Sequence, residues 1–178
     1  TIEEAKTAIA QKKYFCEADL TSYFHQGGIS RSDCQWLEVM HPFSGPYCYT
    51  SSPQGLKNSS EQSYNRLALI FGDMIQDGRM TRMANGLYPL AQSPEELLIN
   101  YTEMLDRLEK SNLTLKPTKT SISPRSAVLF GWKLQGGEWL PQDHIISSLS
   151  RAEKPVTVKQ MRSFCGSVKQ LSSSIPRY

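Results

Sequence analysis

The spacing of apolar residues along the chain predicts two long amphipathic helices. Apolar side chains recur every three or four residues over 58–76 and again over 93–112, the repeat of a helix with one buried face. The second helix has a clear start, because Ser93 can cap it, Pro94 suits the first helical position and Glu96 can complete a capping box. Shorter helical patterns begin near residues 1, 142 and 157.

Between these helices the pattern changes to short apolar runs bounded by turn-forming residues, which predicts strands. The first run, KYFCEADL, ends in a carboxylate at Asp19. Strands arranged in this order around two long helices favour an α+β fold, in which helices back an antiparallel sheet. The other strands are predicted at 36–56 (two strands, with a turn at 42–46), 80–90 (a hairpin), 113–116, 127–134 and 138–141, the last two joined through Gly136-Gly137.

The hairpin at 80–90 carries Asn85-Gly86 between apolar residues on both sides. This dipeptide is the strongest short-range hairpin signal, because both residues tolerate the positive φ of a type I′ turn. The sequence therefore predicts the tip of the hairpin at Asn85-Gly86.

Composition places the chain among ordinary soluble globular proteins. Its 178 residues are 39% hydrophobic and 21% charged, enough for one domain or a compact domain with the start of another. The net charge of +3 is compatible with nucleic-acid binding but does not argue for it. There is no apolar run near 18 residues, so no membrane span is expected. The start lacks the apolar core of a signal peptide and an initiator Met, so we expect a piece of a longer protein.

The four cysteines are scattered along the chain, without a C-x-x-C pair or an adjacent His pair. That spacing disfavours a zinc site and favours reduced thiols in an intracellular protein, cytoplasmic or nuclear.

Three segments around the hairpin carry residues in a recognisable order. KYFCEADLTSYFHQ has a strand-end Asp19 followed five residues later by the aromatic Phe24, and SPQGLKNSSEQSY has Gln54-Gly55 at a strand-to-helix corner. After the second long helix, LTLKPTKT carries Lys119. Two further segments are VLFGWKL (128–134) and KPVTVKQMRSFCGSVKQLSSSIPRY (154–178). Together these five segments resemble the palm of a reverse transcriptase, most closely that of gypsy-class LTR retrotransposons and their retroviral relatives.

The resemblance covers essentially the whole chain and implies its domain organisation. Residues 1–150 would form the palm with part of the fingers, including a fingers-like insertion at about 30–52. Residues 151–178 would form a linker and the first helix towards the thumb or connection, and 128–134 the primer grip. An N-terminal fingers portion, most of the thumb and any RNase H domain are missing, so the rest of a polyprotein or a partner subunit is an expected partner.

The family's reaction is attack of a primer 3′-hydroxyl on the α-phosphate of a nucleotide, assisted by two Mg²⁺ ions about 3.5–4 Å apart. The resemblance makes Asp19 a catalytic metal ligand and implies an RNA or DNA template–primer as partner. It also implies that Phe24 excludes a ribose 2′-hydroxyl, that Gln54 contacts the nucleotide or template, that Gly55 allows close backbone approach, and that Lys119 faces the triphosphate.

Several basic and aromatic residues are candidate nucleic-acid contacts, although a solvated surface position for each single cation, and sheet packing for the tryptophan, are the alternatives. They are Lys116, Arg125, Trp132, Lys133 and Lys159.

One departure from the family pattern decides the expected activity. The family has Tyr-x-Asp-Asp at the hairpin tip, and this chain has MANG over 83–86. Asn85 keeps an amide oxygen but no charge, and Gly86 has no side chain, so these catalytic positions are degenerate. Of three metal carboxylates only Asp19 is left, and one carboxylate cannot hold two Mg²⁺ ions. We therefore expect weak or absent Mg²⁺ binding and little or no polymerase activity.

Three functions stay open from the sequence. The first is a catalytically inactive retroelement-derived domain that binds nucleic acid or acts as a scaffold. The second is a working RNA-directed DNA polymerase domain whose tip is engineered or divergent. The third is a protein-interaction domain without a nucleic-acid role.

Two other carboxylates lie upstream of the hairpin, Asp73 and Asp77. Their spacing gives no reason to expect them at the hairpin tip as replacement metal ligands.

Overall fold

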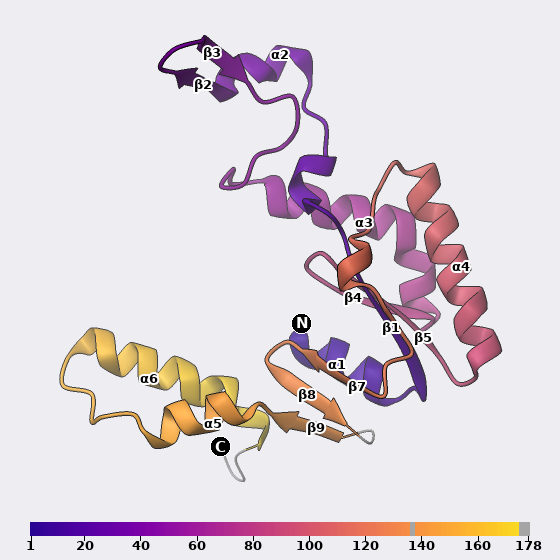
Figure 1. Cartoon of the computed structure of the whole chain (residues 1–178), viewed down its shortest axis with the longest axis vertical. Helices are drawn as coiled ribbons and strands as arrows, with labels where there is room; N and C mark the ends of the chain where they lie inside the picture. Colours follow the sequence, from indigo (N-terminus) through magenta and orange to yellow (C-terminus); the bar gives the residue numbers. More distant parts are fainter. Residues whose placement is uncertain (136–137, 175–178) are drawn as a thin grey trace. The chain divides into compact units, whose positions relative to one another are not determined.

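The computed structural model describes residues 1–135 and 138–174, which form two compact units, Thr1–Pro124 and the residues from Arg125 onward. The first unit contains the two long helices and a four-stranded sheet (Figure 1). Its elements are α1 (Ile2–Ala10), β1 (Tyr14–Asp19), η1 (Tyr23–Gln26), α2 (Arg31–Cys34), η2 (Gln35–Leu37), β2 (Glu38–His41), β3 (Gly45–Cys48), α3 (Ser59–Gln76), β4 (Met80–Met83), β5 (Gly86–Ala91), α4 (Pro94–Lys110), η3 (Pro117–Lys119) and β6 (Ser121–Ile122).

The four-stranded sheet is antiparallel in the order β4-β5-β1-β6, with β1 at its centre. Alternate residues of a strand face opposite sides of the sheet. Ala18 and Leu20 therefore face the same side, where they join Leu67 and Phe71 of α3 and Met104 of α4 in the hydrophobic core. The predicted antiparallel sheet backed by two helices is confirmed.

The other face of β1 carries Glu17 and Asp19, which are only partly buried. Asp19 pairs with Gly86 of β5 across the sheet, so the end of β1 lies beside the start of β5. This register places the strand-end carboxylate at the tip of the β4–β5 hairpin, which is the relation on which the candidate site depends.

The β2–β3 hairpin forms a separate two-stranded sheet, joined to the rest of the first unit through η1 and α3 (Figure 1). Its apolar side chains are unusually open to solvent: Phe43 is 94% exposed and Trp36, just before the hairpin, is 78% exposed.

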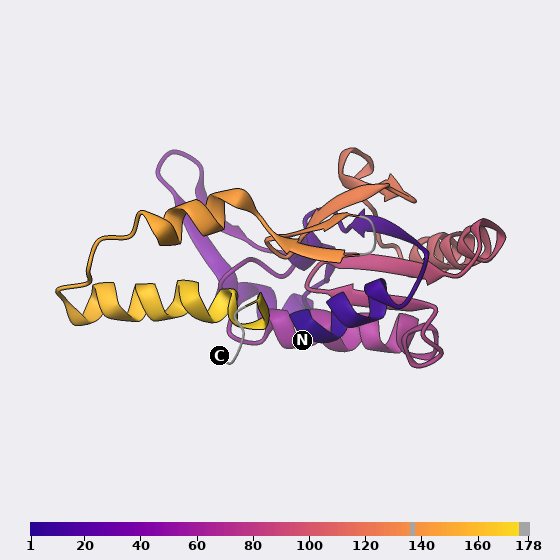
Figure 2. The ribbon, with the colours of Figure 1, turned by 90° about the horizontal axis from the view of Figure 1, so that it is seen from below.

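The second unit contains β7 (Ser126–Leu129), β8 (Trp132–Gln135), β9 (Glu138–Pro141), α5 (Asp143–Ser150), α6 (Val158–Gln170) and η4 (Ser172–Ser174). The three strands form an antiparallel sheet in the order β7-β8-β9, and α5 and α6 follow one another through a loop (Figure 2). Thr157 caps α6 in a capping box with Gln160, as a Thr three residues before a Gln at a helix start favours.

Several local predictions are confirmed and others are wrong. The long helices begin and end close to the predicted residues. Residues 127–134 form two strands rather than one, because Phe130 and Gly131, with φ of 56° and 81°, make a tight turn between β7 and β8. Residues 113–116 form no strand, only a bridge between Leu20 and Leu115. The predicted link through Gly136-Gly137 lies outside the described residues.

The predicted hairpin is also confirmed, but its tip lies one residue earlier than predicted. Met83 pairs with Gly86, so the two turn residues are Ala84 and Asn85, and the positive φ of 50° falls on Ala84. Gly86 is the first residue of β5 and is buried.

Among the described residues, no helix is long and apolar enough to cross a membrane. The division of the chain into palm and thumb-side segments at residue 150 stays a prediction, since the compact units meet at Pro124 and Arg125.

Candidate functional site

The end of β1 is held between two segments that are distant in sequence. On one side, the N–H of Leu20 donates to the carbonyl of Asn85 at 3.0 Å. On the other, the N–H of Lys116 donates to the carbonyl of Asp19 at 2.7 Å. The carboxylate of Asp19 is thereby positioned between the hairpin tip and the turn that carries Lys119.

Both oxygens of the Asp19 carboxylate have a partner within the protein. Nδ2 of Asn85 donates to Oδ1 at 2.5 Å, and Nζ of Lys119 lies 3.3 Å from Oδ2. The Asp19 side chain is 19% exposed, and that of Lys119 is 60% exposed. One amide and one ammonium group therefore compensate this carboxylate, which makes a charge-assisted cluster.

A cavity of about 510 Å³ opens beside this cluster, lined also by Tyr23, Tyr64 and Ala84. It brings together most of the residues that the sequence pointed to, from β1, η1, the 52–60 segment, the hairpin tip and η3. These are Asp19, Phe24, Gln54, Asn85, Lys116 and Lys119.

The remaining predicted residues belong to other segments of the chain. Gly55 follows Gln54 in the turn before α3, and its φ of 96° requires a residue without a side chain. Trp132, Lys133 and Lys159 belong to the second unit, where Trp132 is 3% exposed in β8 and the two lysines are exposed. The roles assigned to all these residues stay predictions.

The donor set around Asp19 does not fit two Mg²⁺ ions. Mg²⁺ prefers several oxygen ligands, and two such ions carry four positive charges. In the part of the chain that the structure describes, no group of three or more His, Cys, Asp or Glu side chains is placed to hold a metal ion. Glu17, two residues before Asp19, is half-buried, and its pKa is raised first by burial and then by the Asp19 charge, while Lys119 lowers it. Burial and the neighbouring Asp19 charge thus both disfavour the ionised form of Glu17 relative to an exposed glutamate.

The carboxylates upstream of the hairpin are used in ion pairs between α3 and α4. Arg107 donates to both oxygens of Asp73, at 2.5 and 2.6 Å, and also to Glu103 at 2.5 Å. This arrangement holds the pKa of Asp73 well below its usual range. Arg79 adds pairs to Asp77 at 3.3 Å and to Glu103 at 2.5 Å. The expectation that Asp73 and Asp77 do not reach the tip agrees with these partners.

Sequence reasoning missed the polar residues that fix the loop after Asp19. The side chain of Gln26 accepts from the N–H of Thr114 at 2.7 Å and donates to the carbonyls of Thr114 and Thr21. Arg66 of α3 donates to the carbonyls of Gln26 at 2.6 Å and Ser111 at 2.7 Å. These bonds join segments up to 88 residues apart, so no local pattern of the sequence could have indicated them.

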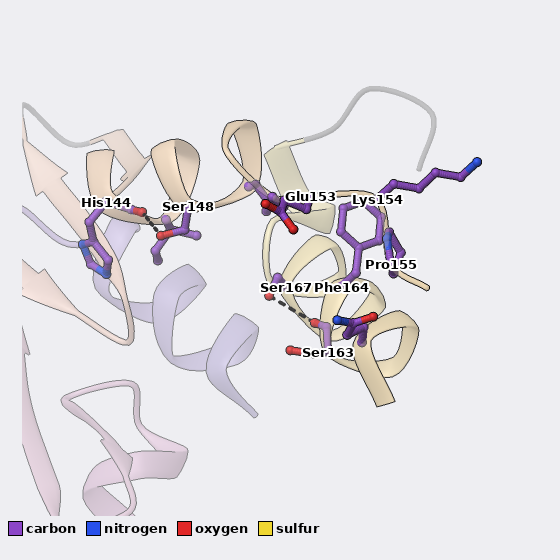
Figure 3. A pocket seen from close by; sticks show the side chains of 12 residues that line it. His144, Ser148, Glu153, Lys154, Pro155, Ser163, Phe164 and Ser167 are labelled. Atoms are coloured by element: carbon purple, nitrogen blue, oxygen red, sulfur yellow. Dashed lines mark hydrogen bonds between the residues drawn. The ribbon is translucent and has the colours of Figure 1, made fainter. Parts of the chain in front are cut away.

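A second cavity, of about 450 Å³, lies within the second unit between α5, the loop that follows it and α6 (Figure 3). The hydroxyl of Ser148 donates to the carbonyl of His144 at 2.6 Å, and that of Ser167 to Ser163 at 3.2 Å. Both hydroxyls therefore have a hydrogen-bond acceptor within their own helix.

Comparison with known proteins gives retrotransposon polyproteins among the relatives of the chain. No model of a known protein family matches the chain. The chain is 23% identical over 176 residues, 99% of its length, to the Transposon Tf2-7 polyprotein of Schizosaccharomyces pombe, and 21% identical over the same span to the Tf2-3 polyprotein of that organism. It spans about 13% of the length of these polyproteins.

Solved structures with the same fold include foamy viral protease-reverse transcriptases. One, in complex with double-stranded DNA, superposes with a TM-score of 0.80 at 15% identity over 90% of this chain and 28% of that one. Another, in complex with an RNA/DNA hybrid, gives a TM-score of 0.76 at 14% identity over 94% of this chain and 23% of that one. The chain is a reverse-transcriptase-like domain related to those of LTR retroelements. In this reverse-transcriptase-like domain, the cavity beside Asp19 lies at the end of β1, an inner strand of the four-stranded sheet.

Proposed function

We propose that this reverse-transcriptase-like domain has lost the polymerase reaction and retains a nucleic-acid-binding or scaffold role. The observation that carries the proposal is the set of partners of Asp19. The one metal carboxylate that the family pattern leaves in place is hydrogen-bonded to the amide of Asn85 and paired with the ammonium of Lys119.

The charges around Asp19 support the loss of the polymerase reaction. Bringing Mg²⁺ to this carboxylate requires displacing Lys119 and overcoming the absence of the two tip carboxylates that the family uses. The rate enhancement in this family depends on two bound metal ions. A hairpin tip without the two carboxylate ligands should therefore lose most of that rate enhancement. Where Mg²⁺ is weakly held or absent, the polar groups that line the cavity include the ammonium groups of two lysines, Lys116 and Lys119, and the side-chain amides of Asn85 and Gln54.

The retained binding role is supported by the shape and charge around the cavity. The related foamy viral structures hold double-stranded DNA or an RNA/DNA hybrid. In this chain Lys116 and Lys119 line the cavity, and Lys133 and Lys159 are exposed in the second unit. Contacts of such lysines with backbone phosphates require neither a metal ion nor the tip carboxylates.

The context of the chain is part of the same proposal. Because its relatives are polyproteins, we infer that further segments of such a polyprotein, or a partner subunit, accompany it.

The state of the cysteines supports an intracellular location. All four are free thiols: Cys16, Cys34, Cys48 and Cys165.

Primer extension on an RNA template, with Mg²⁺ or Mn²⁺, tests the loss of the reaction. The protein and its Asp19→Ala variant should give the same background incorporation, because the carboxylate is not used to hold metal. Extension clearly above that of the Asp19→Ala variant would contradict the proposal and favour a working polymerase domain with a divergent tip.

A second candidate function is protein–protein contact without nucleic-acid binding. The exposed apolar side chains of the β2–β3 region, with Phe43 94% and Met40 71% exposed, favour it. Binding of an RNA–DNA hybrid, measured between about 50 and 200 mM salt, separates the two functions. A steep loss of affinity with salt supports the nucleic-acid role, and no binding even at the lower salt supports the second candidate.

A further inference from the structure

The glycine at the start of β5 is required by a neighbouring side chain rather than by the backbone. The φ of Gly86 is not in the positive region that favours glycine. A Cβ atom built on Gly86 would instead lie 2.5 Å from the hydroxyl oxygen of Tyr88 and 2.9 and 3.0 Å from two of its ring carbons. Since Cβ atoms in proteins essentially never approach other atoms this closely, any side chain at residue 86 requires the Tyr88 ring to move.

Tyr88 is poorly placed to move. It lies two residues along β5 from Gly86, and therefore on the same face of the sheet, and it is 5% exposed. That face also carries Glu17 and Asp19 of β1. Burial, and then the charges of these two carboxylates, raise the pKa of the Tyr88 phenol. A rotation that freed the space over Gly86 would have to take a buried aromatic ring out of its packed position, which is costly.

We propose that Gly86 and Tyr88 are a coupled pair, in which the Tyr88 ring fills the space that the second tip carboxylate of an active reverse transcriptase requires. The metal site is then closed as well as uncharged. Restoring carboxylates at residues 85 and 86 is not sufficient to restore metal binding, because a third change, at Tyr88, is needed first. This inference rests on the proposed loss of the metal site and names the residue that maintains it.

A double-mutant cycle tests the steric coupling without any measurement of activity. Gly86→Ala should lower the thermal midpoint of the full chain by about 4 °C, the scale expected for overpacking in a domain of this size. In the Tyr88→Leu background the same Gly86→Ala change should cost less than about 1 °C, because the clash is gone. An equal cost in both backgrounds would overturn the proposal.

Two matched controls sharpen this cycle. Tyr88→Phe removes the hydroxyl but keeps the ring carbons at 2.9 and 3.0 Å, so Gly86→Ala should still be destabilising in that background, by less than in the original chain. Gly72 of α3 has nothing within 4 Å of its built Cβ, so Gly72→Ala should leave the midpoint unchanged or raise it. A loss at Gly72→Ala equal to that at Gly86→Ala would show that the effect is not due to Tyr88.

Metal binding provides the second readout. Mn²⁺ titration should show at least about tenfold tighter binding for Asn85→Asp/Gly86→Asp/Tyr88→Leu than for Asn85→Asp/Gly86→Asp. The Asn85→Asp/Tyr88→Leu variant should not share this gain, because it lacks the carboxylate at residue 86. Equal affinity with and without the Tyr88→Leu change would overturn the inference. If the unaltered protein extends primers, the proposed function fails, yet the stability cycle still decides whether Gly86 and Tyr88 are coupled.

Discussion

Asn85 donates a 2.5 Å hydrogen bond from its side-chain amide to Oδ1 of Asp19, joining the hairpin tip to the end of the central strand. The resemblance of the sequence to reverse transcriptases predicts a second carboxylate at this position, and two adjacent carboxylates repel one another. Here an uncharged amide replaces it, and the pair is attractive without any ion. This contact therefore also stabilises the fold.

The sign of the Asp19→Ala effect on stability distinguishes these two arrangements. Clustered catalytic carboxylates commonly destabilise an apo enzyme, so that removing one increases its stability. In this chain the same substitution leaves the Asn85 amide and the Lys119 ammonium without their acceptor. We expect Asp19→Ala to lower the free energy of unfolding by about 1–2 kcal/mol, measured by urea denaturation. Asp19→Asn, which keeps an acceptor oxygen, should lose less, and an increase in stability for Asp19→Ala would contradict the account.

Gln26 should matter for the site although it lies outside the cavity. Its side chain bonds to Thr21 and Thr114, the residues that follow Asp19 and precede Lys116. Gln26→Ala should cost about 2 kcal/mol of unfolding free energy, because it removes several hydrogen bonds between these segments. Gln35→Ala is a matched control, since its amide makes one exposed bond to Ser32 and its loss should cost less than about 0.5 kcal/mol. Equal effects of the two substitutions would rule out the bridging role of Gln26.

The ion pairs between α3 and α4 predict how stability depends on acid. Arg107 keeps the pKa of Asp73 in the folded protein below its ordinary value of 3.8. As the pH falls, Asp73 is therefore protonated in the unfolded chain before it is protonated in the folded protein. The stabilisation from this ion pair is complete above about pH 4 and is lost as the pH falls towards the lower pKa of Asp73 in the folded protein. Unfolding measured from pH 6 to pH 3 should show a shallower acid loss for Asp73→Asn than for the original chain. Asp106→Asn, which removes an exposed pair with Lys110, should leave the slope near that of the original chain.

The two lysines that line the cavity should contribute to the salt dependence of nucleic-acid binding. If Lys116 and Lys119 each contact one backbone phosphate, removing either should reduce the slope of log K against log salt by about 1. Lys13→Ala is the control, because Lys13 precedes β1 and lies at the opposite end of that strand from Asp19. Fluorescence anisotropy with a labelled RNA–DNA hybrid measures all three slopes. Slopes that do not change at Lys116 and Lys119 would place the binding surface elsewhere.

The sequence predicted well those features that local patterns encode. The long helices, the Ser93 cap of the second one, the end of β1 at Asp19 and the hairpin follow from apolar periodicity and turn chemistry. The tip was misplaced by one residue because Asn85-Gly86 is a favourable turn pair, whereas the strand register puts Gly86 opposite Asp19. The position of the turn depends on the pairing of β5 with β1, which is distant in sequence. No local sequence pattern indicates that pairing.

Side-chain interactions across the fold could not be predicted in the same way. The sequence predicted the loss of two tip carboxylates but gave no sign that the ring of Tyr88 occupies the space over Gly86. It suggested a triphosphate contact for Lys119, and the structure places the ammonium 3.3 Å from Asp19. Both relations depend on the three-dimensional arrangement of β1, β5 and η3, which spacing along the chain does not determine.

Binding of Mn²⁺ to the unaltered protein tests whether Asp19 still holds a metal ion. Electron paramagnetic resonance can count the free ion during a titration of the full chain and of its Asp19→Ala variant. We expect no site tighter than about the millimolar range and identical titrations for the two proteins. A micromolar Mn²⁺ site in the original chain that disappears in Asp19→Ala would contradict this expectation.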